Sequence, residues 1–576
     1  MTTSNNASPD YSIPEEAQKL FLNGILKNTL MRGLPAELDS LSKHVQFEGS
    51  SKPSIPINWR FSESISALKA FEATMLNSLL TRKYKIEPVD ITINTDHASL
   101  FFMSVFLAQL IKNDNLVPVS PIHKDWQNLF PDLDKHRSQS DLHRTLITNI
   151  YKTGDGRFYH VHGKGSKHVR LISRLMYMTG SMNPEPSLAA MGLPFNGEPN
   201  DTYDNVVDRI QSKVLQIDSA ELDGLMNDKN RQAGTIAWTA DEYFSSEHGQ
   251  ENGQIGLYEI IKDPASTQPQ SWWPDHPSIP SSPKRPLAGL KVVDLTRVIA
   301  APTITRGLAE MGASVMRVTS PHITDFSFLH HDLNWGKWNC HLHLKDEEDK
   351  KKLRDLIREA DVVVDGYRPG VMERLGFGRQ AIFDLVKDRS YGIIHVRENC
   401  YGWHGPWSHR SGWQQISDAC CGVSMSYGQA MGNEEAVTPV FPNSDYCTGV
   451  CGSTAVLDGL IKRAESGGSY GIDVSLNYYS QWLVRSCGTY NNQIWKDVWT
   501  RHGSPVFRHY HAMQYTIPAM LQLIREYDHE ILFKPKFFEK RRAVNADSTF
   551  IVVKPIAQFQ KDGMVNLGYW DTDEWS

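Results

Sequence analysis

An alternation of short apolar runs with amphipathic segments begins after residue 286 and constrains the fold more than any other feature. Four runs have the length and composition of buried strands: residues 290–296, 314–318, 361–364 and 391–396. Between them, residues 301–313 and 347–360 carry apolar side chains at helical spacing. Because strands separated by helices pair in parallel, the sequence predicts an α/β fold with a parallel sheet and flanking helices.

The first turn from strand to helix argues against a dinucleotide cofactor. Its sequence is DLTRVIAAPT (294–303), which contains no glycine. A pyrophosphate-binding loop needs glycine so that the backbone can approach the phosphates closely. We therefore expect a Rossmann-like sheet that does not bind NAD or FAD in the usual way.

Composition divides the chain at residues 264–286, a segment rich in proline and serine. We expect four further parts: an N-terminal tail and helical lead-in (1–52), a first half (53–263), a second half (287–500) and a C-terminal segment that closes the fold (501–576). The two halves share a weak internal repeat, in which LNSLLTRK (76–83) resembles LDGLIKRA (457–464) at an offset of 381 residues. Short apolar matches also arise by chance, so the repeat is a hypothesis.

Charge, apolar content and cysteine spacing exclude several classes of protein. The formal net charge is −6 and no long basic run occurs, so no nucleic-acid partner is expected. No apolar stretch approaches the roughly 18 residues of a membrane span, and the first residues do not form a secretory signal. We therefore expect no membrane partner and a cytoplasmic location. Cys447 and Cys451 lack a second pair of ligands at zinc-like spacing, so no metal site is expected.

Four motifs in the second half occur in the order of a known family. They are residues 286–318, the segment 333–378 that ends in RPGVMERLGFG, the loop 401–413 and the segment PVFPNSDYCTGVCGSTAVLDGLIKR (439–463). With these motifs the chain resembles the class III CoA-transferase family (CaiB/BaiF), which includes formyl-CoA and carnitine CoA-transferases and α-methylacyl-CoA racemases. The resemblance implies the class III CoA-transferase fold, with a smaller α+β domain beside the large one. It also implies a coenzyme A thioester as substrate and no tightly bound cofactor.

The first half resembles the same family less closely. Residues 57–93 are similar to the segment that carries the family's nucleophile, and later stretches are similar to its small domain. The offset of the repeat aligns Ser64 with Asp445. We therefore expect this half to be a divergent partial copy that lacks the nucleophile, although Glu63 is adjacent.

The resemblance identifies Asp445 as the catalytic carboxylate. In the family this residue attacks the thioester of an acyl-CoA, and the reaction passes through a mixed anhydride and an aspartyl-CoA thioester before an acceptor acid leaves as the new thioester. Covalent catalysis keeps the acyl group activated through each step. The segment PNSDYCTG precedes an apolar helix, whose N-terminal N–H groups favour an oxyanion. From the residues alone, a helix N-cap is the other interpretation of Asp445.

CoA carries a pyrophosphate and a 3′-phosphate, so cationic side chains are expected along its groove. The resemblance points to Arg368 in the YRPG motif, followed by Lys337 and Arg297. Gly370 is expected to shape the turn. For any one of the cationic side chains, a solvated surface position is the alternative.

Departures from the family motifs bear on the reaction. Racemases carry a Gly-His-Asp triplet, which this chain replaces with Gly412, Trp413 and Gln414. Neither Trp nor Gln can abstract a proton from an α-carbon, so racemisation would need another base such as His404. Thr319 stands where the family usually has an acid, and no glycine-rich loop of the oxalate-type members is recognisable.

Three hypotheses follow. The leading one is transfer of CoA from an acyl-CoA donor to a carboxylic acid acceptor. The alternatives are an acyl-CoA racemase or isomerase, and a catalytically inactive CoA-binding homologue. Members of the family form interlocked dimers, so we expect a homodimer, or a pseudo-dimer in which the two halves pack within one chain.

Overall fold

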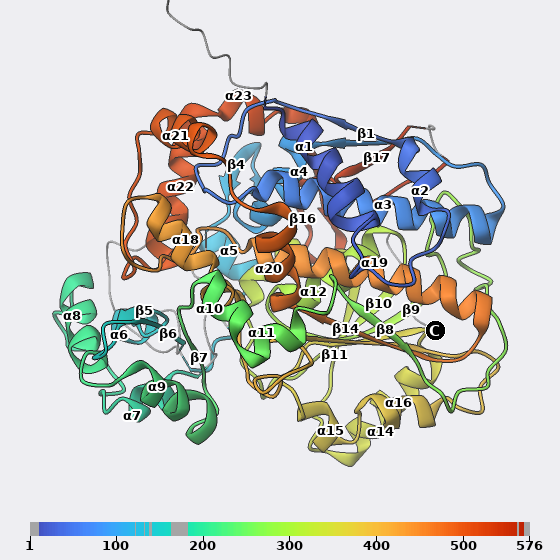
Figure 1. The fold of residues 1–576 in the computed structure, drawn as a ribbon. Helices are drawn as coiled ribbons and strands as arrows, with labels where there is room; N and C mark the ends of the chain where they lie inside the picture. Colours follow the sequence, from blue (N-terminus) through green and yellow to red (C-terminus); the bar gives the residue numbers. More distant parts are fainter. Residues whose placement is uncertain are drawn as a thin grey trace, which may run out of the picture.

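The computed structural model describes residues 11–120, 123–131, 133–136, 141–162, 183–560 and 564–569. Its largest sheet has seven strands in the order β11-β10-β9-β12-β13-β14-β8. Figure 1 shows this sheet from its edge, with helices above and below it. Six of the strands run parallel: β9 (Lys291–Leu295), β10 (Ser314–Thr319), β11 (Lys337–His341), β12 (Val362–Asp365), β13 (Ile394–Asn399) and β14 (Tyr470–Ser475). The four strands expected from the sequence are among them, and the predicted α/β fold is confirmed.

Helices cover both faces of this sheet, because successive strand residues point to opposite sides. The face of Val293 packs against α14 (Glu347–Glu359). The face of Val292 packs against α12 (Ala300–Glu310) and α19 (Asn443–Ser466), which lie together above the sheet in Figure 1.

Glycines let α12 and α19 approach each other closely. A Cβ atom on Gly449 would lie 2.3 Å from the Cβ atom of Thr303, and one on Gly452 would lie 2.5 Å from Cδ1 of Ile304. Both distances are far below van der Waals contact, so the packing leaves room only for glycine. This contact fixes the first turn of α19, which contains Asp445, above the sheet.

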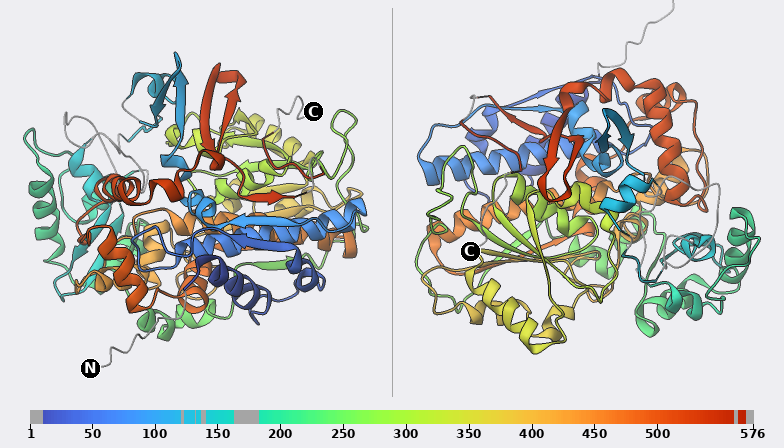
Figure 2. Two further views of the ribbon diagram at one scale, coloured as in Figure 1. Left: turned by 90° about the horizontal axis from the view of Figure 1, so that it is seen from above. Right: turned by 180° about the vertical axis from the view of Figure 1, so that it is seen from behind.

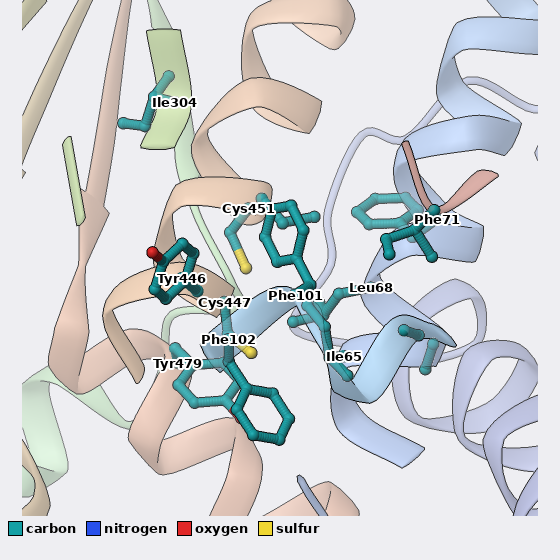
Figure 3. Packing of buried hydrophobic residues seen from close by; sticks show 14 of the residues in the cluster. Ile65, Leu68, Phe71, Phe101, Phe102, Ile304, Tyr446, Cys447, Cys451 and Tyr479 are labelled. Atoms are coloured by element: carbon teal, nitrogen blue, oxygen red, sulfur yellow. The ribbon is translucent and has the colours of Figure 1, made fainter. Parts of the chain in front are cut away.

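A second long helix, α3 (Phe61–Tyr84), packs against another side of α19. Figure 3 shows the apolar side chains between them, including Ile65 and Leu68 of α3 and Cys447 and Cys451 of α19. These residues belong to one hydrophobic core that extends into the large sheet. The two halves of the chain therefore share a core.

The two halves also meet at matching positions. Ser453 of α19 donates a hydrogen bond to Glu72 of α3, and the two residues are 381 positions apart, which is the offset of the sequence repeat. β2 (Ile91–Asn94) follows α3 in the chain as β14 follows α19. Contact between equivalent positions is the arrangement expected at a local two-fold axis.

The other described strands form three smaller sheets, β1-β2-β17, β15-β16-β3-β4 and β5-β6-β7. The last contains β5 (Asn149–Lys152), β6 (Phe158–His162) and β7 (Ala233–Ile236), all antiparallel. It packs with helices such as α8 (Tyr203–Val214) around a hydrophobic core of its own. This α+β unit lies to one side of the large sheet (Figure 2) and is the expected smaller domain.

The seventh strand of the large sheet was not predicted from the sequence, and it comes from the end of the first half of the chain. β8 (Glu259–Lys262) precedes the segment 264–286 and pairs antiparallel with β14 at the edge of the sheet. Its four residues carry no signal that distinguishes an edge strand from a loop. None of the described helices has an apolar stretch long enough to cross a membrane.

Gly449→Ala should lower the free energy of unfolding by about 1–3 kcal/mol, because the new methyl group overlaps Thr303 in a contact with no room to relax. Gly224→Ala is the control, since its nearest contact is Asp228 at 4.0 Å. A helical glycine replaced by alanine gains up to about 1 kcal/mol where nothing clashes. Equilibrium denaturation in urea measures both variants, and equal stability would contradict the close packing.

Candidate active site

A cavity of about 420 Å³ opens at the carboxyl edge of the large sheet. Its wall includes residues from the ends of five parallel strands and the loops after them: Arg297, Val298, Thr324, Gly366, Arg368, Asn399, Cys400 and Leu476. In open α/β sheets, ligands bind at this edge. The cavity is therefore the candidate active site.

Asp445 reaches this cavity from the first turn of α19. Hydrogen bonds to other elements fix the three residues around it: Asn443 to Tyr479 (2.6 Å), Ser444 to Asp418 (2.6 Å) and Tyr446 to Asp332 (2.7 Å). Within the described part of the chain, no hydrogen bond reaches the Asp445 carboxylate itself. The N-cap position belongs to Pro442, so Asp445 does not cap the helix.

The surroundings of Asp445 make its ionised form reactive. Burial raises the pKa of Asp445 well above its usual value, and the carboxyl groups of Glu398 and Asp418 raise it further. The side chain is only 8% exposed. A carboxylate that is poorly solvated and lacks hydrogen-bond donors is a stronger nucleophile than one in water.

Arg368 and Arg297 both line the cavity, from the loops after β12 and β9. Arg297 donates a hydrogen bond to the backbone oxygen of Thr324 (2.7 Å), and its guanidinium lies 5.2 Å from the ring centroid of Tyr367. Burial lowers the pKa of Arg368, and the neighbouring charge of Arg297 lowers it further. Two guanidinium groups on one cavity wall create a positive potential that favours phosphate.

The turn that carries Arg368 depends on glycine. Gly370 has a φ of 80°, a left-handed conformation that residues with a Cβ atom rarely adopt. This placement agrees with the expected role of Gly370 in shaping the turn.

Lys337 lies away from the cavity wall. Its side chain is fully buried, and Nζ donates to the carboxylate of Asp294 (3.0 Å), the backbone oxygen of Pro302 (3.0 Å) and the hydroxyl of Thr305 (2.7 Å). All three ammonium protons therefore have partners. Lys337 joins β11 to β9 and α12, and it does not line the cavity that Arg368 and Arg297 line, so its contact with CoA stays a prediction.

Several residues of the cavity wall carry no motif that sequence reasoning could use. His136, Asn183 and Gln232 approach from the part of the chain that contains the small domain. Arg410 also lines the cavity but pairs with Asp223 at 2.8 Å, so its charge is already balanced. Glu398 was not predicted as a site residue either. Its position just after a predicted parallel strand (391–396) could have indicated it, because an acid at that end of a strand faces the ligand-binding edge of the sheet.

A side pocket of about 10 Å³ adjoins Asp445. Its wall combines apolar side chains with two amides: Val298, Ile299, Phe326, Leu329, Trp413, Gln414 and Gln415. Val298 lines the main cavity as well and has a φ of 74°, a conformation that costs a β-branched residue about 1–3 kcal/mol. Backbone strain of this kind is typical of functional sites. Here the strained residue, Val298, borders both the main cavity and the side pocket.

Of the residues that bear on racemisation, Trp413 and Gln414 line the side pocket beside Asp445, and His404 lies elsewhere. Trp413 lines the cavity, whereas Gln414 donates a hydrogen bond to Asp418 (2.5 Å). His404 is not part of the cavity wall, and its ring is bonded to the carboxylate of Glu259 (2.8 Å). The base that racemisation would require is therefore not supplied by His404.

In the first half, the position in α3 that the repeat aligns with Asp445 is Ser64, and side chains fill the space around it. Ser64 is fully buried and its hydroxyl is hydrogen-bonded to Tyr479 (2.9 Å). Glu63 is also fully buried and accepts hydrogen bonds from Tyr490 (3.1 Å) and Tyr11. Among the described residues, no cluster of three side chains suited to a metal ion occurs.

Comparison with known proteins identifies the family. The model of CoA-transferase family III matches residues 287–511. Over 563 residues the chain is 61% identical to the acetyl-coenzyme A transferase nodX of Hypoxylon pulicicidum, which covers 98% of this chain and 92% of that protein. Because this similarity spans nearly the whole chain, the protein belongs to CoA-transferase family III. Membership supports an enzyme that transfers CoA.

Two further relatives are more distant. An acyl-CoA transferase of Gibberella moniliformis is 28% identical over 544 residues, covering 91% of this chain and 88% of that protein. A crystal structure of Rv3272 from Mycobacterium tuberculosis aligns with 48% of this chain and 93% of that chain, at 20% identity and a TM-score of 0.37.

Lys337→Met should destabilise the protein by about 3–5 kcal/mol, because it leaves the carboxylate of Asp294 buried without its cation. Lys291→Met on β9, the strand that carries Asp294, is the control, since its partner Glu359 is largely exposed and the pair contributes at most about 1 kcal/mol. Denaturation midpoints measure the difference. A stable Lys337→Met protein with a raised KM for acyl-CoA would instead make Lys337 a CoA ligand.

Proposed function

We propose that the protein transfers CoA from an acyl-CoA donor to a carboxylic acid acceptor, with Asp445 as the nucleophile. The observation that carries this proposal is the placement of Asp445, a desolvated carboxylate on the wall of a cavity at the carboxyl edge of the sheet. Its neighbours are anchored while the carboxylate accepts no hydrogen bond from the described residues. The names of the relatives agree with this class of reaction.

The reaction proceeds by two exchanges at Asp445. Its ionised carboxylate attacks the thioester carbonyl, and the tetrahedral intermediate expels CoA thiolate to leave a mixed anhydride. The thiolate attacks the aspartyl carbonyl, which releases the donor's acid and leaves an aspartyl-CoA thioester. The acceptor carboxylate attacks this thioester and expels CoA thiolate, which leaves a second mixed anhydride. Thiolate attack on the acceptor carbonyl of this anhydride then frees Asp445. No net proton is consumed, and every covalent intermediate is an activated carboxyl derivative, so the energy of the thioester passes from donor to acceptor without loss to water.

The two arginines and the side pocket suggest how a donor is held. Arg368 and Arg297 would bind phosphate groups of CoA through charge-assisted hydrogen bonds. The side pocket beside Asp445 has room for one small group, so we propose acetyl-CoA as the donor. The name of the relative with 61% identity agrees with a two-carbon acyl group.

Mass spectrometry of the peptide that contains Asp445 tests the covalent step. After incubation with acyl-CoA thioesters, a hydroxylamine quench should convert Asp445 alone into its hydroxamate, since hydroxylamine traps activated carboxylates. The yield should be highest with acetyl-CoA and should fall with longer acyl chains, because the side pocket is small. Exchange of the α-proton of an acyl-CoA without any adduct would instead favour the racemase.

Asp445→Asn should lower kcat at least about 10³-fold, because the amide keeps the shape of the side chain but is not a nucleophile. The matched control Asp355→Asn changes an exposed acid on α14 and should leave kcat unchanged. Turnover of Asp445→Asn within tenfold of the unchanged protein would exclude nucleophilic catalysis by this residue.

Arg368→Ala should raise the KM for acyl-CoA about 10- to 100-fold with little change in kcat, because a hydrogen bond to a charged group contributes about 1.5–3 kcal/mol. Arg358→Ala, at an exposed ion pair on α14, is the control. Dephospho-CoA thioesters identify the phosphate concerned, since loss of the 3′-phosphate should reduce the effect of the substitution only if Arg368 binds that group.

We also propose that the first half takes the place of a partner subunit. The shared core of α3 and α19 and the contact of Ser453 with Glu72 support a pseudo-dimer within one chain. Light scattering should therefore give the mass of one chain at concentrations where the protein is active. Activity that disappears on dilution as a dimer dissociates would contradict this. The cytoplasmic location stays a prediction.

A further inference from the structure

Glu398 places a second carboxyl group on the wall of the Asp445 cavity, and the reaction as written above does not use it. It lies near the carboxyl end of β13, where it is in register with Val474 of β14. The preceding residue, Arg397, pairs with Asp473 at 2.9 Å. Because side chains alternate along a strand, Glu398 points to the opposite face from this ion pair, which is the face covered by α12 and α19.

The described surroundings of Glu398 favour its neutral form. Among the described residues, Glu398 has no ion pair and its carboxyl group has no hydrogen-bond partner. The acids whose charges act with it are Asp365 of β12 and Asp445 of α19. The basic side chains of the cavity wall are Arg297, Arg368, Arg410, His136 and His322. A partly buried carboxyl group beside other carboxyl groups and without a paired cation is more stable when protonated.

We propose that Glu398 is a further catalytic residue, which as the neutral acid donates a hydrogen bond to the oxyanion formed when Asp445 attacks the thioester. This inference rests on the proposed function. Negative charge moves from the Asp445 carboxylate to the carbonyl oxygen of the substrate, so a donor fixed on the same cavity wall stabilises the product of that step more than the reactant. The proton stays on Glu398, and no bond to it breaks.

The pH dependence follows from the two carboxyl groups. Below the raised pKa of Asp445 the nucleophile is protonated, so the rate should increase as the pH rises through that value. Burial and the charge of Asp365 raise the pKa of Glu398 to about 8. Above it, Glu398 becomes an acceptor whose charge opposes the oxyanion, so the rate should fall. Because Asp445 and Glu398 interact, the apparent pKa values of the rising and falling limbs describe the pair of residues together and neither residue alone.

The experiment measures the single-turnover rate of hydroxamate formation at Asp445 with acetyl-CoA across pH 5–10. In Glu398→Gln the amide still donates a hydrogen bond but does not titrate, so the rate should stay within about tenfold and the alkaline limb should disappear. In Glu398→Ala the donor is gone, and the rate should fall about 10²-fold at the optimum. Glu373→Gln, an exposed carboxyl-to-amide change on α15 (Val371–Leu375), should keep the complete profile.

Two results would overturn the inference: an alkaline limb that Glu398→Gln leaves unchanged, or a Glu398→Ala protein with the full rate. Circular dichroism and the denaturation midpoint show whether each variant is folded, and Glu398→Gln provides the test if Glu398→Ala is not. The proposed function fails separately. If the unchanged protein forms no adduct at Asp445, covalent CoA transfer is excluded. If it forms the adduct and Glu398→Gln keeps the limb, only the role of Glu398 is excluded.

Discussion

The packing of α19 is the constraint on which the rest of the molecule depends. On one side, glycines bring its backbone against α12 and the large sheet, and on another side α3 covers it with apolar side chains. Asp445 stands in its first turn, so the position of the carboxylate is set by contacts with both halves of the chain. Substitutions in α3, far from the cavity in sequence, therefore act on the same helix that carries the site.

Much of the large domain could be predicted because its strands are buried on both faces. Runs such as 362–364 are apolar throughout, and the helices between them have an amphipathic pattern that needs no knowledge of tertiary contacts. β8 and β11 were not predicted, since each lies at an edge of the sheet and carries polar residues. For such strands, pairing with a neighbour determines the structure and the local sequence does not.

The candidate site also contains residues that the sequence predicted and residues that it did not. Asp445, Arg297 and Arg368 follow motifs and reach one cavity because the loops at the carboxyl edge of a parallel sheet converge. Lys337 lies within a motif as well, yet its ammonium group points into the protein toward Asp294. A sequence does not show whether a lysine faces a ligand or a buried acid. Nor does it show that Glu398 shares a face of the sheet with Asp445, since that depends on register across several strands.

β8 has a consequence for how this protein can be divided. The region matched by the family model begins at residue 287, but the strand that completes its sheet is supplied by residues 259–262. A fragment cut at the proline-rich segment would leave the backbone groups of β14 open along one edge, where a strand of another molecule could pair. The natural unit of this protein is thus defined by its hydrogen-bonded sheet and not by the limits of its recognisable sequence motifs.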